Sequence, residues 1–494
     1  MIKRVANAYP EKLAIIEDEE KISYQQLWQE IESLSNALKL IGIRKNTRVA
    51  IILPNCKEFI YSFLALLNIT AIAVPLKPQM TCWELNGIFK NCTPKALILT
   101  PSLLNKILGE KPFLLKNKII ILKEEKHEIR IMDKNGYLEN VTLHTFCTLL
   151  KMGKEQGTRK RRIQTPPRQV ASINYTYRGY GYPLGAMLTH NNYIHGAYNY
   201  IRHRKSSPDE TVLLVLPCNH ILPLVGCILV PLLVGGKIAL LDSYSPKHIL
   251  RAISSFNVNI LVMVPTLFHI LVNYYRNEKH DISSLKYGIS GGSFMHFQLS
   301  KLIKDKMNLD IIQGYGLTEC QPVTCNFLTN NKPDTLGFPL HNVQIKIIDE
   351  KENDCGTDRI GEILIKTSQT MLGYYRNKSD TKKVIKNGWF YSGDYGKLDE
   401  DGYLHFKGLK KDIVKVGGNV IDLLEIKKCI LFIDGIKNII FDIQDDDLWG
   451  SKIRVNLWVD SNCVNYSSND VKKFLGEYLS LYKIPSEIII WENK

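Results

Sequence analysis

The chain has 494 residues, 45% hydrophobic and 23% charged, a composition typical of soluble globular proteins that excludes a disordered or collagen-like chain. This length fits two or three domains rather than one small one. Lys and Arg total 64 against 49 Asp and Glu, and this net charge of +15 permits an anionic partner such as a nucleotide, CoA, an acidic carrier protein or an anionic membrane. The basic residues come without zinc-ligand spacing, a basic helix or an aromatic RNA-binding motif, so we expect no nucleic-acid partner.

The cysteine pattern and the apolar runs predict a cytoplasmic location. The eleven cysteines are scattered and form no CxxC pair, which favours reduced thiols. The opening residues, MIKRVANAYPEK, contain no apolar core, so we expect no secretory signal. The longest apolar run, at 221–234, has fourteen residues with two prolines and a glycine, too few to span a bilayer comfortably. We expect a buried helix or strand pair there, and at most peripheral contact with a membrane.

Strand and helix patterns alternate along the first half of the chain. Apolar side chains recur at helical spacing over 23–40, after a candidate Ser cap, and over 57–70. Apolar runs typical of short buried strands lie at 48–55, 71–78, 95–100, 237–242 and 259–265. The alternation predicts an α/β fold in which a parallel sheet carries helices on its faces.

Two segments depart from this alternation. Residues 153–168 (GKEQGTRKRRIQTPPR) are polar and basic and contain Pro and Gly, which predicts an exposed loop. We interpret its basic run at 159–162 as a solvated surface, or else as a docking site for an acidic carrier protein or anionic lipid. From about residue 335, short alternating strands with turn signals predict a compact, mostly β section. The composition changes again after Gly408, and we expect a domain boundary near residue 409.

The heptad GYGLTEC at 314–320 follows the apolar LDIIQ, so we expect it where a strand ends and the chain turns. Open α/β sheets bind ligands in the loops at the carboxyl ends of their parallel strands. Tyr315 offers a flat face to a purine base. Thr318 supplies a hydroxyl for a phosphate oxygen, and Glu319 is a hard oxygen ligand suited to Mg²⁺. Taken alone, the heptad is more simply interpreted as a tight turn that has no function.

A second motif, GWFYSGDYG at 388–396, places Asp394 beside a glycine after a β segment. There its carboxylate can accept both hydroxyls of a ribose, whereas the alternative is a turn in which Asp394 bonds its own backbone. The glycine-rich turn SGG at 290–292 is a third, weaker signal.

In this order, VPTLF (264–268), SGG, GYGLTE, GWFYSGD and GLKKDIVKVGGNVIDLLEI (408–426) make the sequence resemble the adenylate-forming superfamily, from about residue 5 to its end. That superfamily includes acyl-CoA synthetases, peptide-synthetase adenylation domains and firefly luciferase. The resemblance implies an AMP-binding N-terminal domain, residues 1–408, of stacked, mostly parallel sheets with helices and a small β-barrel. A small, mobile α+β C-terminal domain, residues 409–494 and shortened at its end, would follow.

The resemblance also implies a reaction. A carboxylate is activated with ATP and Mg²⁺ to an acyl-adenylate and pyrophosphate, and the acyl group then usually passes to the thiol of CoA or of a carrier protein's phosphopantetheine. In the nucleotide site so implied, Tyr315 stacks on adenine, Asp394 binds the ribose and Thr318 touches the α-phosphate. Glu319 holds Mg²⁺. The other matching nucleotide-binding positions are Thr176, Gly291, Gly292 and Gly316.

Positions for the acyl group and the thiol match as well. By the same resemblance His220, in LPCNH, lies at the entrance of the acyl pocket, and Gly314 is a further substrate position. Lys411 matches the hinge about which the C-terminal domain swings between half-reactions. Gly417 and Gly418 match the turn that narrows the pantetheine tunnel.

The phosphate loop departs from the family's pattern, which reads roughly YTSGTTGxPKG. Here residues 175–185 read YTYRGYGYPLG, so two tyrosines and Arg178 replace small residues and Leu184 replaces a lysine. A phosphate cradle needs small residues, because backbone N–H groups and hydroxyls must reach the oxygens. Arg178 could restore the lost positive charge with a bidentate grip, or it could plug the site.

The C-terminal part departs from the pattern as well. The family's Gly-Arg pair before the hinge reads Gly408-Leu409, and the printed sequence ends at Lys494, before the family's glycine-lysine pair, whose lysine bridges carboxylate and phosphate. With the loop lysine, three phosphate-contacting charges are absent, and each absence would cost a factor of roughly 10²–10³ in rate.

Three hypotheses follow. The first is an acyl-CoA synthetase-like ligase with an unusual phosphate loop. Apolar residues around 221–234 and 261–270 favour a fatty or otherwise apolar carboxylate, and the acidic residue that grips an amino acid's amine is absent around His220. The second is a ligase that loads an acyl carrier protein instead. The third is a non-catalytic descendant that binds nucleotide or acyl ligand; the retained Thr318, Glu319 and Asp394 speak against it.

Overall fold

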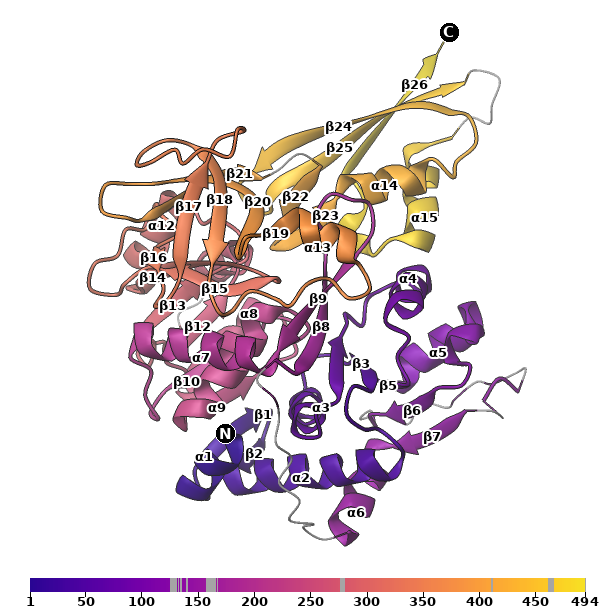
Figure 1. The fold of residues 1–494 in the computed structure, drawn as a ribbon, viewed down its shortest axis with the longest axis vertical. Helices are drawn as coiled ribbons and strands as arrows, with labels where there is room; N and C mark the ends of the chain where they lie inside the picture. The colour runs from indigo at the N-terminus through magenta and orange to yellow at the C-terminus, as the bar shows by residue number, and fades with distance from the viewer. Residues whose placement is uncertain are drawn as a thin grey trace.

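The computed structural model describes residues 1–124, 131, 133, 136–138, 141–156, 166, 168–275, 280–409, 412–460 and 466–493. Two large sheets with surrounding helices form the lower part of the molecule in Figure 1, and the C-terminal strands and helices lie at its top. The two sheets are mostly parallel, which confirms the predicted α/β class.

The nine-stranded sheet has a parallel centre and antiparallel edges. Its strands are, in spatial order, β16 (Phe338–Pro339), β15 (Cys320–Cys325), β14 (Ile311–Leu317), β13 (Tyr287–Ser290), β12 (Ile260–Met263), β10 (Thr211–Leu214), β11 (Lys237–Leu240), β1 (Leu13–Glu17) and β2 (Glu20–Ser23). Neighbours from β14 to β1 pair in parallel. The parallel strands therefore end at one edge of the sheet, where β13 and β14 deliver the SGG and GYGLTE motifs.

The seven-stranded sheet supplies the phosphate loop. Its order is β7 (Thr142–Thr145), β6 (Ile119–Leu122), β5 (Ala96–Leu99), β3 (Arg48–Ile52), β4 (Ile72–Pro75), β8 (Val170–Thr176) and β9 (Leu184–Thr189). All neighbours pair in parallel except β8 and β9, which form an antiparallel hairpin. The loop that joins them contains the altered residues 177–183.

The helices of this large part are α1 (Ile2–Ala8), α2 (Tyr24–Leu40), α3 (Lys57–Asn68), α4 (Cys82–Cys92), α5 (Pro101–Glu110), η1 (Pro112–Leu115), α6 (Phe146–Glu155), α7 (His190–Arg204), α8 (Ile221–Pro223), η2 (Leu224–Leu229), α9 (Val230–Val234), α10 (Pro246–Phe256), α11 (Pro265–Tyr275) and α12 (Phe297–Met307). Ser23 caps α2 through a capping box, as its sequence predicts. The apolar run 221–234 is helical, with a π-helical centre, so the helix alternative is correct and the strand pair is wrong.

The loop predicted over 153–168 is wrong at its start, because residues 153–155 complete α6, whose Gly153 is buried against the backbone of Ser33. The basic run at 159–162 lies outside the described residues.

The β section after residue 335 is a five-stranded sheet. It contains β17 (Gln344–Ile348), β18 (Gly361–Lys366), β20 (Trp389–Leu398), β19 (Ile385–Lys386) and β21 (Leu404–Leu409), with the helix α13 (Lys378–Val384) before β19. All its pairings are antiparallel. This agrees with the predicted run of short strands and places Asp394 in β20.

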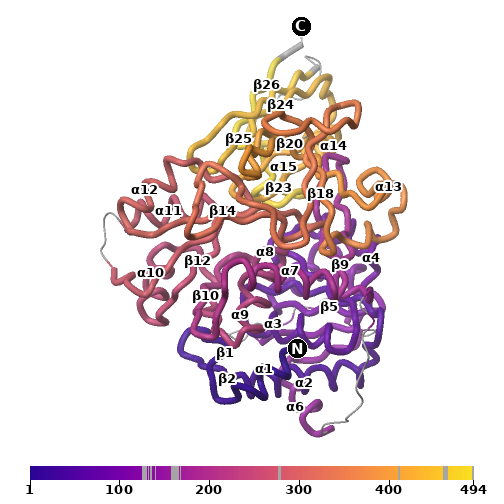
Figure 2. The backbone as a smooth tube through the Cα atoms, turned by 60° about the vertical axis from the view of Figure 1, so that its left-hand side comes forward, coloured from indigo at the N-terminus to yellow at the C-terminus, as the bar shows by residue number. Residues whose placement is uncertain are grey.

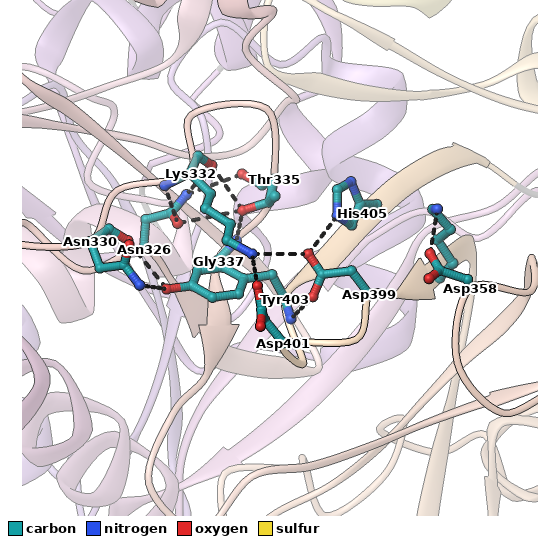
Figure 3. Close-up of polar contacts among 11 residues, drawn as sticks. Asn326, Asn330, Lys332, Thr335, Gly337, Asp358, Asp399, Asp401, Tyr403 and His405 are labelled. Atoms are coloured by element: carbon teal, nitrogen blue, oxygen red, sulfur yellow. Dashed lines mark hydrogen bonds and ion pairs between the residues drawn. The ribbon is translucent and has the colours of Figure 1, made fainter.

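A polar cluster fastens this sheet to the loop after β15 (Figure 3). The Nζ atom of Lys332 lies 2.6 Å from a carboxylate oxygen of Asp401 and 3.4 Å from one of Asp399, which also contacts Nε2 of His405 at 3.1 Å. The amide of Asn326 donates to the backbone carbonyl of Lys332. Because Asp399 and Asp401 lie in the turn between β20 and β21, the cluster fixes β20 relative to the strands that carry the GYGLTE motif.

The C-terminal part has a hydrophobic core of its own, which includes Val414, Ile426, Val455 and Leu475. Its elements are β22 (Ile413–Val416), β23 (Asn419–Asp422), α14 (Leu423–Ile430), β24 (Ile436–Asp446), β25 (Gly450–Asp460), α15 (Ser468–Tyr478), η3 (Leu481–Lys483) and β26 (Glu487–Asn493). Figure 2 shows this part set on one end of the two large sheets. The division into residues 1–408 and 409–494 stays a prediction, to which the separate core lends support.

Neither a membrane span nor a disulfide occurs in the described part of the chain. None of the helices there is long and apolar enough to cross a membrane. The ten cysteines described are all free thiols, and nine of them are buried or half-buried.

Candidate active site

One cavity of about 590 Å³ brings the predicted site residues together. It lies beside the ends of β8, β13 and β14, against β20 and the turn between β22 and β23. The predicted residues that line it are Thr176, Arg178, His220, Gly291, Gly292, Gly314, Tyr315, Gly316, Thr318, Glu319, Asp394, Gly417 and Gly418. Lys411, the predicted hinge, lies outside the described residues.

The end of the cavity where a nucleoside is predicted to bind, called the nucleoside end below, is built around Tyr315 and Asp394. The Tyr315 hydroxyl donates a hydrogen bond of 2.7 Å to Oδ2 of Asp394, and both side chains are almost fully buried. Burial, with the neighbouring carboxylate of Asp394, raises the pKa of Tyr315 well above its usual value, so the phenol keeps its proton. Gly292 has a φ of +82°, and a Cβ there would lie 3.3 Å from Val264, so a side chain would narrow this end.

One local expectation about this end is confirmed and one is wrong. β14 ends at Leu317, and the chain turns at Thr318 and Glu319 before β15, so the heptad lies where a strand ends and the chain turns. Asp394, however, does not follow a strand but lies inside β20, next to Gly393 with its φ of +75°. A register shift between Tyr395 and Gly396 interrupts the ladder there. Such an irregularity re-aims side chains, which is why a strand residue can face the cavity.

The phosphate end contains an ion pair made by an altered loop residue. Arg178 places Nη1 3.6 Å from Oε1 of Glu319, and the two side chains are only 9% and 2% exposed. Nη2 of Arg178 donates to the carbonyl of Tyr391 at 2.9 Å, and the guanidinium lies over the ring of Phe390. Burial by itself would lower the pKa of Arg178, but the carboxylate of Glu319 and the other nearby acidic groups raise it. Arg178 is therefore a fixed cation in the cavity wall.

The residues present do not fit a magnesium ion at Glu319. Its Oε1 already accepts the Tyr374 hydroxyl at 2.7 Å and faces the guanidinium of Arg178, and a permanent cation repels a divalent one. Within the described ranges, no group of three His, Cys, Asp or Glu side chains could hold a metal ion either. The metal-binding role of Glu319 stays a prediction that this arrangement does not support.

Other residues of the altered loop contact the C-terminal part. The backbone N–H of Gly181 donates to Oδ2 of Asp422 at 2.7 Å, and Lys428 donates to the carbonyl of Gly181 at 3.1 Å. The Tyr177 hydroxyl donates to Glu425 at 3.0 Å. A phosphate-loop N–H ordinarily faces an anionic oxygen, and here the oxygen is a protein carboxylate.

Lys483 joins three distant elements below this loop, and sequence reasoning missed it. Its ammonium lies 2.5 Å from Glu84 on α4 and 2.9 Å from Glu425 on α14, and it donates to the Tyr177 hydroxyl at 2.9 Å. Lys483, Glu84 and Glu425 are all buried. Burial alone would lower the pKa of Lys483, but these neighbours hold it well above its usual value. The ammonium thus stays charged and links the C-terminal part to the loop.

The remaining wall is largely apolar, and its basic side chains include His220 and Lys77. It includes Leu216, Ile221, Leu222, Val264, Leu267 and Ile270. His220 lies there, and burial, followed by the nearby Lys77, lowers the pKa of His220 to about 3, so its imidazole is neutral. Lys77 also lines the cavity and was not singled out from the sequence, because the segment PLKP reads only as the end of an apolar strand.

A family model described as AMP-binding enzyme matches residues 2–375, well over half of the chain. The chain belongs to the AMP-binding enzyme family. The adenylate-forming resemblance is thereby confirmed, as is the class of AMP-forming enzyme of the acyl-CoA synthetase kind. Among curated members, a long-chain-fatty-acid–CoA ligase of Bacillus subtilis (strain 168) is 25% identical over 97% of this chain and 88% of its own. A 2-succinylbenzoate–CoA ligase of Oceanobacillus iheyensis is 27% identical over 98% and 93%.

Solved members of this AMP-binding fold support the same architecture. An amide bond synthetase from Marinactinospora thermotolerans superimposes with a TM-score of 0.84 at 19% identity, covering 99% of this chain and 95% of its own. An o-succinylbenzoate CoA synthetase double mutant from Bacillus subtilis gives 0.83 at 21% identity, covering 99% and 94%. At these identities the likeness shows the fold, and the stacked sheets with a smaller β sheet agree with the predicted arrangement.

Proposed function

We propose that this AMP-binding enzyme activates an apolar carboxylate, a fatty acid in the first instance, with ATP and passes the acyl group to the thiol of CoA. The observation that carries the proposal is the single cavity. It combines a nucleoside end, an apolar wall and the Gly417–Gly418 turn, which are the three parts that an adenylating acid–thiol ligase needs.

In the activation step a carboxylate oxygen attacks the α-phosphorus of ATP. The new acyl–oxygen–phosphorus bond forms as the bond from the α-phosphorus to the bridging oxygen breaks, and pyrophosphate leaves. Negative charge grows on the α-phosphate oxygens, so fixed donors there lower the barrier. The Thr318 hydroxyl and the Arg178 guanidinium are the donors that line this end. Asp394 and Tyr315 would hold ribose and base.

The docked C-terminal part favours the transfer step. The carbonyl oxygen of Gly418 lies 4.0 Å from the Cβ position of Gly292, and a Cβ on Gly418 would meet Val264 at 2.7 Å, so the turn closes on the wall that holds the acyl group. The Thr266 hydroxyl donates to the carbonyl of Leu448 at 2.8 Å and holds the two parts together there. The turn is thus placed to guide a narrow thiol arm toward the acyl-adenylate. The reduced thiols of the cytoplasm, our predicted location, suit such an acceptor.

One observation favours a second candidate, a nucleotide- or acyl-binding protein that does not adenylate. The phosphate end is filled by protein charges, since Arg178 pairs with Glu319 and Asp422 takes the N–H of Gly181. A protein that only binds would show nucleotide affinity without pyrophosphate release.

The test is carboxylate-dependent pyrophosphate release from ATP across fatty acids of graded chain length, with Asp394→Ala as the blank. CoA and phosphopantetheinylated acyl carrier protein are supplied in parallel as acceptors, with Mg²⁺ or with EDTA. Release above the blank and acyl-CoA formation support the proposal. Transfer to the carrier protein alone would replace CoA as acceptor, and ATP binding without release would favour the second candidate.

A further inference from the structure

Lys77 is held at the junction between the large part of the chain and the Gly417–Gly418 turn. It follows β4 by two residues, and its Nζ donates to Oδ1 of Asn419, the residue after the turn, at 2.5 Å. The amine lies 4.0 Å from the centre of the Tyr482 ring. The side chain lines the cavity, as do Asn419, Tyr482 and His220. Side chains of two elements, Asn419 of β23 and Tyr482 of η3, therefore hold this amine where the proposed thiol arm would enter.

Among the residues that the structure describes, no carboxylate pairs with Lys77, whose amine contacts Asn419 and Tyr482. Glu84 is the acidic group that acts on the charge of Lys77. Its carboxylate, however, already pairs with the Lys483 ammonium at 2.5 Å and accepts a hydrogen bond from the Ser480 hydroxyl at 2.5 Å. Burial, followed by the positive charge of Lys483, lowers the pKa of Lys77 to about 7, and Glu84 opposes this only in part. Near neutral pH a fraction of the Lys77 side chains would therefore carry a free lone pair.

The other titratable groups that face Lys77 do not exchange protons near neutral pH. Burial, followed by Lys77 itself, lowers the pKa of His220 to about 3, and burial raises the pKa of Tyr482 to about 12. Lys483 stays protonated, because its acidic neighbours outweigh burial and raise its pKa. A general base works best when its pKa lies near the working pH, and a neutral imidazole with so low a pKa is a weak base.

We propose that Lys77 is the general base that deprotonates the acceptor thiol in the acyl-transfer step. The inference rests on the proposed function. The thiol proton moves to Nζ of Lys77, and the sulfur forms a bond to the acyl carbon. The bond between that carbon and the phosphate oxygen breaks, so AMP leaves with the electron pair, and the Lys77 ammonium then returns its proton to solvent. The step needs no oxidant or reductant, and thioester and AMP are its products.

The experiment isolates this step by supplying dodecanoyl-adenylate and CoA to the full chain and measuring thioester formation in single turnovers between pH 5.5 and 9. Lys77→Met should lower the rate about 100-fold or more, the usual range for a lost general base. Lys77→Arg should be nearly as slow, because a guanidinium cannot accept the proton. The wild-type rate should rise with pH, with an apparent pKa near 7. In both variants this rise of the rate with pH should be absent. Lys90→Met, an exposed lysine on α4, is the matched control and should behave as wild type.

Two further variants distinguish proton transfer from a structural role. Asn419→Asp would place a carboxylate against Nζ, which raises the pKa of Lys77 and should move the basic limb to higher pH without abolishing the reaction. Lys77→Ala should recover part of its rate when ethylamine is added, since a small amine can occupy the space and take the proton. A side chain that only supported the fold would show neither behaviour.

Several results would overturn the inference. A wild-type rate in Lys77→Arg would mean that a positive charge suffices, and a wild-type rate in Lys77→Met would remove the residue from the step. Acylation of Lys77 by the adenylate in the absence of CoA would make it a nucleophile rather than a base. Failure of the wild-type chain to form thioester from the supplied adenylate would overturn the proposed CoA ligation as well, whereas failure only with ATP would leave the Lys77 result standing.

Discussion

The two ends of the cavity differ in what satisfies their polar groups. At the predicted nucleoside end, the Tyr315 hydroxyl is the one side-chain donor to the Asp394 carboxylate among the described residues, so carboxylate oxygens remain for a ribose. At the phosphate end, protein groups stand where phosphate and metal would be expected. Arg178 faces Glu319 as a cation, and Asp422 accepts the loop N–H of Gly181 as an anion. The comparison teaches that the side chains predicted to bind a nucleoside keep free acceptor oxygens, while the predicted phosphate cradle is taken up by contacts within the protein.

The largest effect is expected from replacing Lys483, whose ammonium links the altered loop to α4 and α14. Lys483→Met would leave Glu84 and Glu425 as unpaired buried carboxylates, and breaking a buried pair in this way costs about 3–5 kcal/mol. The measurement is urea unfolding followed by fluorescence. The exposed Lys473→Met on α15 is the control and should stay within about 0.5 kcal/mol of wild type. AMP affinity of the folded variant should be unchanged, and a parallel loss of affinity would contradict the separation of the two ends.

The nucleoside end is tested by Asp394→Ala. Loss of two hydrogen bonds from ribose hydroxyls to a carboxylate should weaken AMP binding about 100-fold, because hydrogen bonds to charged groups are among the stronger ones. Isothermal titration calorimetry with AMP measures it. Tyr315→Phe keeps the ring and removes only the hydroxyl, so it should weaken AMP binding much less. Equal effects of the two variants would mean that the hydroxyl-to-carboxylate bond, rather than a ribose contact, maintains this end.

Arg178 decides whether the phosphate end can accept a divalent cation. ATP affinity of the wild-type chain should be nearly equal in Mg²⁺ and in EDTA, because Glu319 already faces a guanidinium. Arg178→Ser frees this carboxylate, and ATP should then bind about tenfold more tightly with Mg²⁺ than without it, roughly 1.4 kcal/mol. Arg178→Lys retains the charge and should behave as wild type. A wild-type chain with strong Mg²⁺ dependence would show that the ion pair opens when ATP binds.

Local patterns made the fold predictable from the sequence. Ser23, the strand-like runs and the heptad around Tyr315 each determine their local structure within a few neighbouring residues, and the elements formed where expected. The contacts that join the C-terminal part to the cavity wall have no such local signal. Gly181 and Asp422 are 241 positions apart, and Lys77 and Asn419 are 342 apart. Each of these residues reads locally as a turn, a helix cap or a strand end, so only the docking of the two parts reveals the pairing.

The phosphate-loop replacements illustrate the same limit. Their chemistry could be weighed in advance, and Arg178 was expected either to grip phosphate or to plug the site. Which partner it meets depends on Glu319, Tyr374 and Tyr391, which come from three other segments. The close packing at Gly181 is likewise evident only in the folded chain, because a Cβ there would lie 2.6 Å from Nζ of Lys428, which is distant in sequence.

The smallest effect is expected where the C-terminal part occupies a phosphate-binding N–H. Asp422 accepts Gly181 N–H through Oδ2 and caps α14 through Oδ1, which accepts from Leu424 at 2.9 Å. Asp422→Asn keeps the cap, because asparagine caps helices as well as aspartate does. The substitution removes the negative charge and places the Nδ2 donor opposite the Gly181 N–H, which is itself a donor. The Gly181 N–H then loses its acceptor and becomes available to a phosphate oxygen. ATP should then bind about three- to tenfold more tightly relative to adenosine, a gain of roughly 0.7–1.4 kcal/mol.

Adenosine separates this effect from a general change in the cavity, since it occupies the nucleoside end without phosphates. Asp434→Asn, an exposed residue of the same part, changes the net charge equally and should leave the ATP-to-adenosine ratio unaltered. If Asp422→Asn strengthens both ligands alike, the carboxylate acts through the position of the whole C-terminal part. If it strengthens neither, the loop does not bind phosphate even when freed, and the phosphate end serves only to dock the C-terminal part.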